Sequence, residues 1–163
     1  MRRFKLALLA LAVVVPVLGS ASPAGADLRC SSWVSWEYGA GYFVVVRSCI
    51  NHSTSNVTGR TEVYLNWSGI VQPQFEYVGL VTTVFKNGNN VGSDVCDRTS
   101  AANNPFAHDT AAEAMVCLVT VPRSSGTWQT RSNVCVDGLV PNTAYRCISD
   151  TAFGIQWSPT HPL

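Results

Sequence analysis

The chain has 163 residues, of which 47% are hydrophobic and 13% charged, and its formal net charge is +1 at pH 7. This length suffices for one domain with a sizeable core. Beyond the first few positions the Lys and Arg residues are scattered singly, which argues against a nucleic-acid-binding face and a polybasic membrane patch, because both need clustered cations.

The first segment, residues 1–26, has the three parts of a secretory signal peptide. Two arginines and a lysine form its positive start, an apolar stretch follows, and a small-residue Ala-Gly-Ala cleavage site ends at Ala26. The apolar stretch is shorter than the roughly 20 residues that a membrane-spanning helix needs. We therefore expect export, removal of this segment, and one secreted, extracellular domain over residues 27–163, without membrane insertion.

The remaining chain has the pattern of β-strands separated by turn residues. The expected strands, rich in β-branched and aromatic residues, are residues 30–37, 42–50, 61–67, 75–86, 91–96, 113–121, 127–136, 143–149 and 153–157. Asn87-Gly88 is a strong turn signal, residues 51–59 are expected to form a polar loop, and residues 97–112 are the least regular stretch. The strand spacing predicts an all-β fold, a single disulfide-stapled antiparallel β-sandwich.

Six cysteines follow the leader, and in an exported chain an even number predicts disulfides. A hairpin centred on Gly39 and Ala40 places Cys30 opposite Cys49, close enough for a bond. The other four are expected to pair as sequence neighbours, with an immunoglobulin-type bond between sheets as the alternative. The neighbour pairs are Cys96 with Cys117 and Cys135 with Cys147.

Exposed tryptophans would favour carbohydrate binding, because flat rings stack on sugar faces, but sandwich cores also bury aromatic rings. The register of the first hairpin places Trp36 on a core face, and Trp33 on the opposite face, where it is the best candidate for sugar contact. In that register Trp36 shares its face with Val34, Phe43 and Val45, whereas Trp33 lies beside Val44 and Val46.

Residues 139–147, Leu-Val-Pro-Asn-Thr-Ala-Tyr-Arg-Cys, resemble the E–F corner of fibronectin type III and related immunoglobulin-like domains. Leu139, Pro141 and Tyr145 match the Leu, Pro and Tyr of that corner. The resemblance implies structural roles for all three, with the tyrosine hydroxyl bonded to backbone a few residues upstream. It also implies an immunoglobulin/fibronectin-III-like sandwich, whose strands E, F and G would be residues 127–136, 143–149 and 153–157.

His108-Asp109 is the most plausible catalytic pair, because a His–Asp dyad activates water in secreted phospholipases. The cysteine and long helix that accompany that dyad are missing, so a small secreted hydrolase is only an alternative. Calcium could use the acidic residues of this region, but their spacing follows no known ligand pattern. His52 and His161 are expected in mobile segments. Zinc needs three or four ligands at close spacing and the cysteines are used in disulfides, so we expect no metal and no cofactor. The acidic residues that calcium could use are Asp94, Asp97, Asp109 and Glu113.

The leading expectation is a non-catalytic, secreted module that binds another protein. In gross organisation alone, the chain also resembles the small secreted adaptor subunits of umbrella-type toxin particles, which implies an adaptor role in an extracellular assembly. Loops on rigid sandwiches commonly carry recognition, and a carbohydrate-binding module is the second alternative. The predicted contact residues are Asn103, Asn104, Phe106, His108 and Asp109 of the irregular loop, together with Trp33.

Overall fold

Two antiparallel β-sheets make up the computed structural model, which describes residues 27–39, 41–67, 74–104, 111–138, 146–147 and 156–163. The first sheet contains β1 (Arg29–Cys30), β2 (Val34–Gly39), β3 (Tyr42–His52), β4 (Asn56–Trp67) and β7 (Met115–Pro122). The second contains β5 (Tyr77–Lys86), β6 (Asn89–Asp97), β8 (Thr127–Asp137), β9 (Arg146–Cys147), β10 (Gln156–Trp157) and β11 (His161–Pro162). The helical segments described are α1 (Thr99–Ala102) and the 3₁₀ turn η1 (Ala111–Glu113), and neither is long and apolar enough to cross a membrane.

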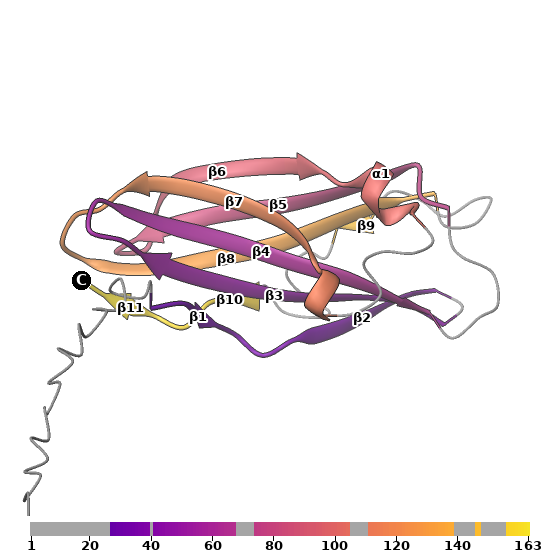
Figure 1. The fold of residues 1–163 in the computed structure, drawn as a ribbon, viewed down its shortest axis with the longest axis horizontal. Helices are drawn as coiled ribbons and strands as arrows, with labels where there is room; N and C mark the ends of the chain where they lie inside the picture. Colours follow the sequence, from indigo (N-terminus) through magenta and orange to yellow (C-terminus); the bar gives the residue numbers. More distant parts are fainter. Residues whose placement is uncertain (1–26, 40, 68–73, 105–110, 139–145, 148–155) are drawn as a thin grey trace, which may run out of the picture.

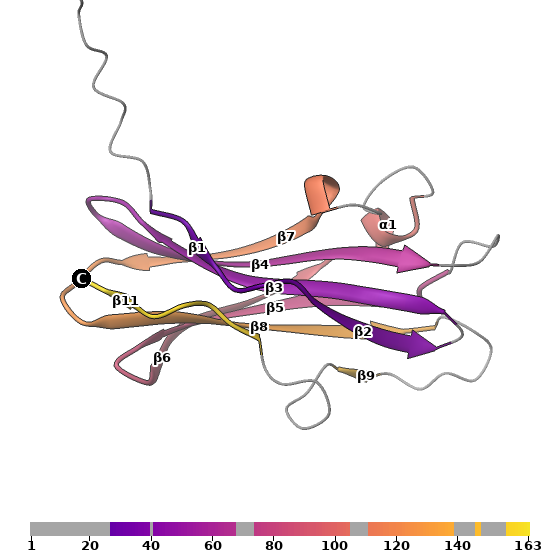
Figure 2. The ribbon, with the colours of Figure 1, turned by 90° about the horizontal axis from the view of Figure 1, so that it is seen from below.

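The strand order places two free edges on the same side of the molecule. The first sheet runs β1-β3-β4-β7, with β2 also on β3, and the second runs β10-β8-β5-β6, with β9 and β11 also on β8. Strands β6 and β7 therefore end their sheets, and Figure 1 shows both along one long side. Figure 2 shows β4 and β7 in one layer, and β5, β6 and β8 in the other.

The core lies between the two sheets because alternate residues of each long strand point inward. One apolar cluster gathers around Trp36, Val44, Leu65 and Leu80, and a second contains Trp128 and its neighbours near the opposite end. Burial of these side chains away from water supplies the main driving force for folding.

A layer of buried hydroxyl groups also joins the sheets. Thr61 Oγ1 on β4 lies 2.8 Å from Ser132 Oγ on β8 and 2.7 Å from Thr82 Oγ1 on β5. Ser48 Oγ donates to the carbonyl oxygen of Thr130 at 2.8 Å. Because buried polar groups are costly unless paired, these bonds fix how the two sheets face each other.

Most of the predicted strands and all three predicted disulfides are confirmed. The bonds are Cys30–Cys49, Cys96–Cys117 and Cys135–Cys147. The Asn87-Gly88 turn is also confirmed, with φ angles of 50° and 82° at the two residues. Three disulfides and an all-β structure are consistent with an extracellular protein.

The polar loop predicted over residues 51–59 is wrong. Strand β3 continues to His52 and β4 begins at Asn56, so residues 53–55 alone join them. The Ser, Thr and Asn residues of this stretch alternate with inward-facing Val57, which is the pattern of a half-buried strand. Of the last two predicted strands, the described residues contain only the two-residue strands β9 and β10.

The register predicted for the first hairpin holds at only one end. Cys30 is opposite Cys49 as predicted, but Trp36 is opposite Val44, one residue away from the predicted pairing. The cause is that the chain leaves the sheet between β1 and β2 and has a further irregularity between Glu37 and Gly39. Trp36 is in the core, but beside Val44 and Val46, not Phe43 and Val45 as predicted.

Candidate functional site

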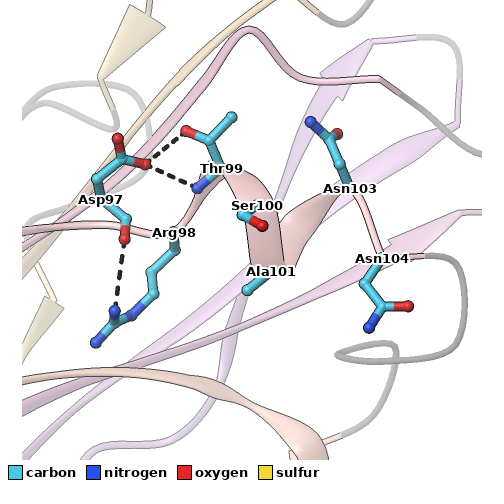
Figure 3. Close-up of a pocket in the computed structure, with 7 residues that line it drawn as sticks. All are labelled: Asp97, Arg98, Thr99, Ser100, Ala101, Asn103 and Asn104. Atoms are coloured by element: carbon cyan, nitrogen blue, oxygen red, sulfur yellow. Dashed lines mark hydrogen bonds between the residues drawn. The ribbon is translucent and has the colours of Figure 1, made fainter.

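The turn that follows β6 is built on Asp97. Its Oδ1 atom accepts hydrogen bonds from Thr99 N at 2.9 Å and Thr99 Oγ1 at 2.7 Å (Figure 3). These two bonds hold the pKa of the Asp97 carboxyl below its usual value, because they stabilise the ionised form. A hollow of about 770 Å³ lies here and is lined by Asp97, Arg98, Thr99, Ser100, Ala101, Asn103 and Asn104.

Several polar side chains that line this hollow form hydrogen bonds that stabilise the fold. Arg98 donates from Nε and Nη2 to the carbonyl oxygen of Val116, at 3.1 and 2.6 Å, which ties the turn to β7. Asn103 accepts from Phe75 N and donates to Phe75 O, both at 2.8 Å, as a strand partner would. Asn103, predicted as a contact residue, therefore stabilises the chain that leads into β5.

The other predicted contact residues of this region fall in two groups. Asn104 is exposed and lines the same hollow. Phe106, His108 and Asp109 lie outside the described residues, as do Leu139, Pro141 and Tyr145 of the corner that resembles the fibronectin type III family.

Trp33 lies on the outer face of the first sheet, where it is only half-buried. The Arg47 guanidinium lies over its ring, 4.3 Å from the ring centroid, and the Tyr64 ring meets it edge-on at 5.0 Å. Its predicted neighbours Val44 and Val46 are in the core instead, because of the shifted register. One face of this ring is therefore covered by a cation and unavailable for stacking on a sugar.

A buried carboxylate holds the arginine that covers that tryptophan. Glu62 is 2% exposed, and its two oxygens lie 2.6 Å from Arg47 Nε and 2.5 Å from Arg60 Nε. Burial of a charge is tolerated where opposite charges and hydrogen bonds compensate it. The group fixes Arg47 in place and therefore fixes Trp33.

The free edges β6 and β7 carry most of the large apolar side chains that remain exposed in the described residues. Val91 and Val95 on β6 are 43% and 56% exposed, and Leu118 on β7 is 52% exposed. The one other such residue described is Leu28, near the start of the domain. We call the surface formed by β6 and β7 the paired edge, because the Cys96–Cys117 disulfide joins the two strands.

The paired edge is acidic along β6. Asp94 and Asp97 are exposed, and the strand contains no Lys or Arg. Asp94, Cys96 and Cys117 form the one group of potential metal ligands in the described residues, but the two sulfur atoms are bonded to each other and so do not bind metal as thiolates.

Two histidines from different sheets meet at the other end of the sandwich. His161 Nε2 on β11 contacts His52 Nδ1 on β3. His161 is 3% exposed, and burial lowers its pKa, with the positive charges of Arg29, His52 and Arg123 acting in the same direction. The prediction that both histidines lie in mobile segments is wrong, since each belongs to a strand.

Sequence reasoning found the strand that contains Val91 and Val95 but not its role. Valines at alternate or four-residue spacing are typical of a buried strand face, and only the strand order shows that β6 is an edge. The acidic and polar character of the residues between these two valines was the feature of the sequence that indicated an exposed edge strand. No protein-family model and no curated protein sequence matches this chain.

Proposed function

We propose that this chain is a secreted, non-catalytic protein-binding module, an adaptor that holds its partner along the paired edge. The observation that carries the proposal is the concentration of exposed apolar side chains on two adjacent edge strands. Val91, Val95 and Leu118 lie there, on strands joined by a disulfide, with Val95 on the outer face of the second sheet and Leu118 on the outer face of the first. Apolar side chains gathered on a surface, with polar groups around them, mark sites of protein interaction.

The paired edge is also rigid, which favours recognition because little conformational freedom is lost on binding. The disulfide fixes β6 on β7, and Arg98 fixes the following turn on the same strand. The hollow at α1 begins at Asp97, the last residue of β6, so the paired edge continues into the region of the predicted contact loop. A partner that covers Val95 can therefore also contact Asn104.

We also infer that the sandwich has immunoglobulin-like connectivity. Strands β3, β4 and β7 follow the order A-B-E, and β10, β8 and β5 follow the order G-F-C. Strand β6 extends the second sheet next to β5, at the place of the C′ strand of variable-type domains. In this alignment β8 takes position F, one position later than the sequence resemblance assigned, and residues 139–145 follow it.

The proposal is tested by capture of partners from the medium of the native producer. The wild-type protein is compared with the double variant Val95→Ser/Leu118→Ser, which removes apolar surface from the paired edge, and with Leu28→Ser, which removes it elsewhere. We expect a discrete protein that the wild type and Leu28→Ser retain, and that the double variant binds about tenfold more weakly. Recovery of monomers only, or equal retention by the double variant, contradicts the proposal.

A further inference from the structure

Strand β6 has backbone groups that point away from its sheet. It pairs with β5 and with no other strand among the described residues. Arg98 N donates to the carbonyl oxygen of Val78 on β5 at 2.7 Å. In an antiparallel pair, the N–H and C=O groups of successive residues point alternately toward the partner strand and away from it. The N–H and C=O groups of Ser93, Val95 and Asp97 therefore face outward.

Side chains occupy two of these outward groups, and the carbonyl oxygen of Asp97 accepts from Arg98 Nη1 at 3.4 Å (Figure 3). The N–H of Val95 donates to Asp94 Oδ1 at 2.8 Å, which shows that this group is not used by β5. A local bond to the side chain of the preceding residue competes with strand pairing, and an incoming carbonyl oxygen can replace it. Seven of the nine residues of β6 are exposed, so an incoming chain meets no covering element in the described structure.

The geometry of β6 also limits where a chain can pair. The register with β5 shifts between Val84 and Phe85, which leaves Val91 in a bulge. From Gly92 onward the strand is regular and lies close above β7, since a Cβ atom at Gly92 would lie 2.7 Å from Val121 Cγ1. The regular free edge is therefore residues 92–97.

We propose that residues 92–97 of β6 bind an extended, basic segment of the partner protein as an added β-strand. Main-chain hydrogen bonds to Ser93 and Val95 supply affinity, as in other cases of strand addition. Exposed Asp94 and Asp97 favour Lys or Arg on the added strand. The inference rests on the proposed function only in that the partner is a protein.

The same charges favour a different protein over a second copy of this chain. Two β6 strands paired with each other would bring Asp94 and Asp97 of both copies to one edge, where like charges repel. Edge strands in natural proteins carry such charges as protection against self-association. The added strand is therefore basic, with apolar side chains on the face that it shares with Val95 and Lys or Arg on the face that it shares with Asp94.

The test uses a blocked synthetic peptide of alternating lysine and valine, titrated into the ¹⁵N-labelled protein. A second peptide carries N-methyl groups on alternate amides, which removes the donors of one strand edge, and a third replaces lysine by glutamate. We expect amide shifts at residues 93, 95 and 97 with the first peptide, and about tenfold weaker binding with each of the others. No binding of the first peptide, equal binding of all three, or shifts confined to other strands overturns the inference.

A protein variant tests the same pairing. Val95→Pro removes a donor that faces away from β5, a position where an edge strand tolerates proline, and Val95→Thr is the matched control that keeps the donor. We expect Val95→Thr to bind the lysine–valine peptide as the wild type does, and Val95→Pro to bind it about tenfold more weakly. Equal binding by both variants overturns strand addition. If sedimentation shows that the protein dimerises, with or without the peptide, the edge binds a second copy of this chain. That result would also overturn the inference.

Failure of this inference is distinguishable from failure of the proposed function. If Val95→Ser/Leu118→Ser loses the captured partner while Val95→Pro retains it, the paired edge binds protein through side chains and strand addition is wrong. If the double variant retains the partner, the proposed function itself is wrong.

Discussion

Cys96 of β6 and Cys117 of β7 are bonded, with their Cα atoms 5.6 Å apart, so one covalent link holds the free edge of one sheet on the free edge of the other. The other two disulfides lie within single sheets, where Cys30 is opposite Cys49 and Cys135 is opposite Cys147. The bond between sheets is therefore the one that determines the shape of the paired edge.

Replacement of this bond by serines should destabilise the protein and weaken partner binding together. For a separation of 21 residues, the loss of cross-linking in the unfolded chain corresponds to about 3 kcal/mol of unfolding free energy. Denaturant unfolding of Cys96→Ser/Cys117→Ser measures the stability change. The control Cys135→Ser/Cys147→Ser, with a separation of 12, should lose a similar free energy but keep the partner. Equal loss of binding in both variants would contradict a special role for the paired edge.

The buried His161 should make the protein less stable at acidic pH. Its pKa is lower in the folded protein than in the unfolded chain, so the unfolded state binds more protons below the ordinary value of about 6.5. The unfolding free energy should therefore be unaffected by this group above that value and fall as pH drops below it. Denaturant unfolding between roughly pH 7.5 and pH 5 should show a smaller fall for His161→Gln than for the wild type. Parallel pH profiles would show that His161 does not contribute.

Gly59 should not tolerate a larger residue, because its strand β4 lies close to the second sheet. A Cβ atom there would lie 2.5 Å from Val84 Cγ2 and 2.7 Å from Thr130 Oγ1. Gly59→Ala should lower the unfolding free energy by about 1–3 kcal/mol, the usual effect of overpacking. The control Thr58→Ala, at the neighbouring position on the outer face, should cost less than about 1 kcal/mol. An unchanged melting temperature for Gly59→Ala would mean that the sheets are not packed as described.

Asn103 and Asn104 should separate structure from recognition in the hollow at α1. Asn103→Ala removes both bonds to the Phe75 backbone and should cost about 1–3 kcal/mol, because it leaves partly buried backbone groups unpaired. Asn104→Ala, at an exposed position, should leave stability within about 0.5 kcal/mol of the wild type. Thermal or denaturant unfolding of the two variants measures the difference. Equal stability of both variants would mean that the bonds of Asn103 to the Phe75 backbone do not stabilise the fold.

Local patterns in the sequence predicted the strands and their covalent links. The Asn87-Gly88 turn depends on neighbouring residues, so its sequence was sufficient to predict it, and the Cys30–Cys49 pair was predicted correctly although the register between that pair and the hairpin turn was not. The register of β2 on β3 could not be predicted, because it depends on where the chain leaves the sheet after Cys30. A shift of one residue turns every side chain to the other face, which is why the predicted neighbours of Trp33 were wrong.

The candidate site depended on long-range pairing that a strand pattern does not contain. Val95 and Val44 look alike in the sequence, and only the strand order makes one an edge residue and the other a core residue. The meeting of His52 and His161 from different sheets is a relationship of the same kind. Both follow from how the sheets are assembled rather than from local propensity.

Photo-crosslinking from position 95 tests the central claim most directly. A photoreactive amino acid replaces Val95 in one variant and Leu28, the exposed apolar residue away from the paired edge, in the other. After illumination in the native culture medium, position 95 should give one discrete protein adduct and position 28 none. An adduct from position 28 with none from position 95 would contradict binding at the paired edge.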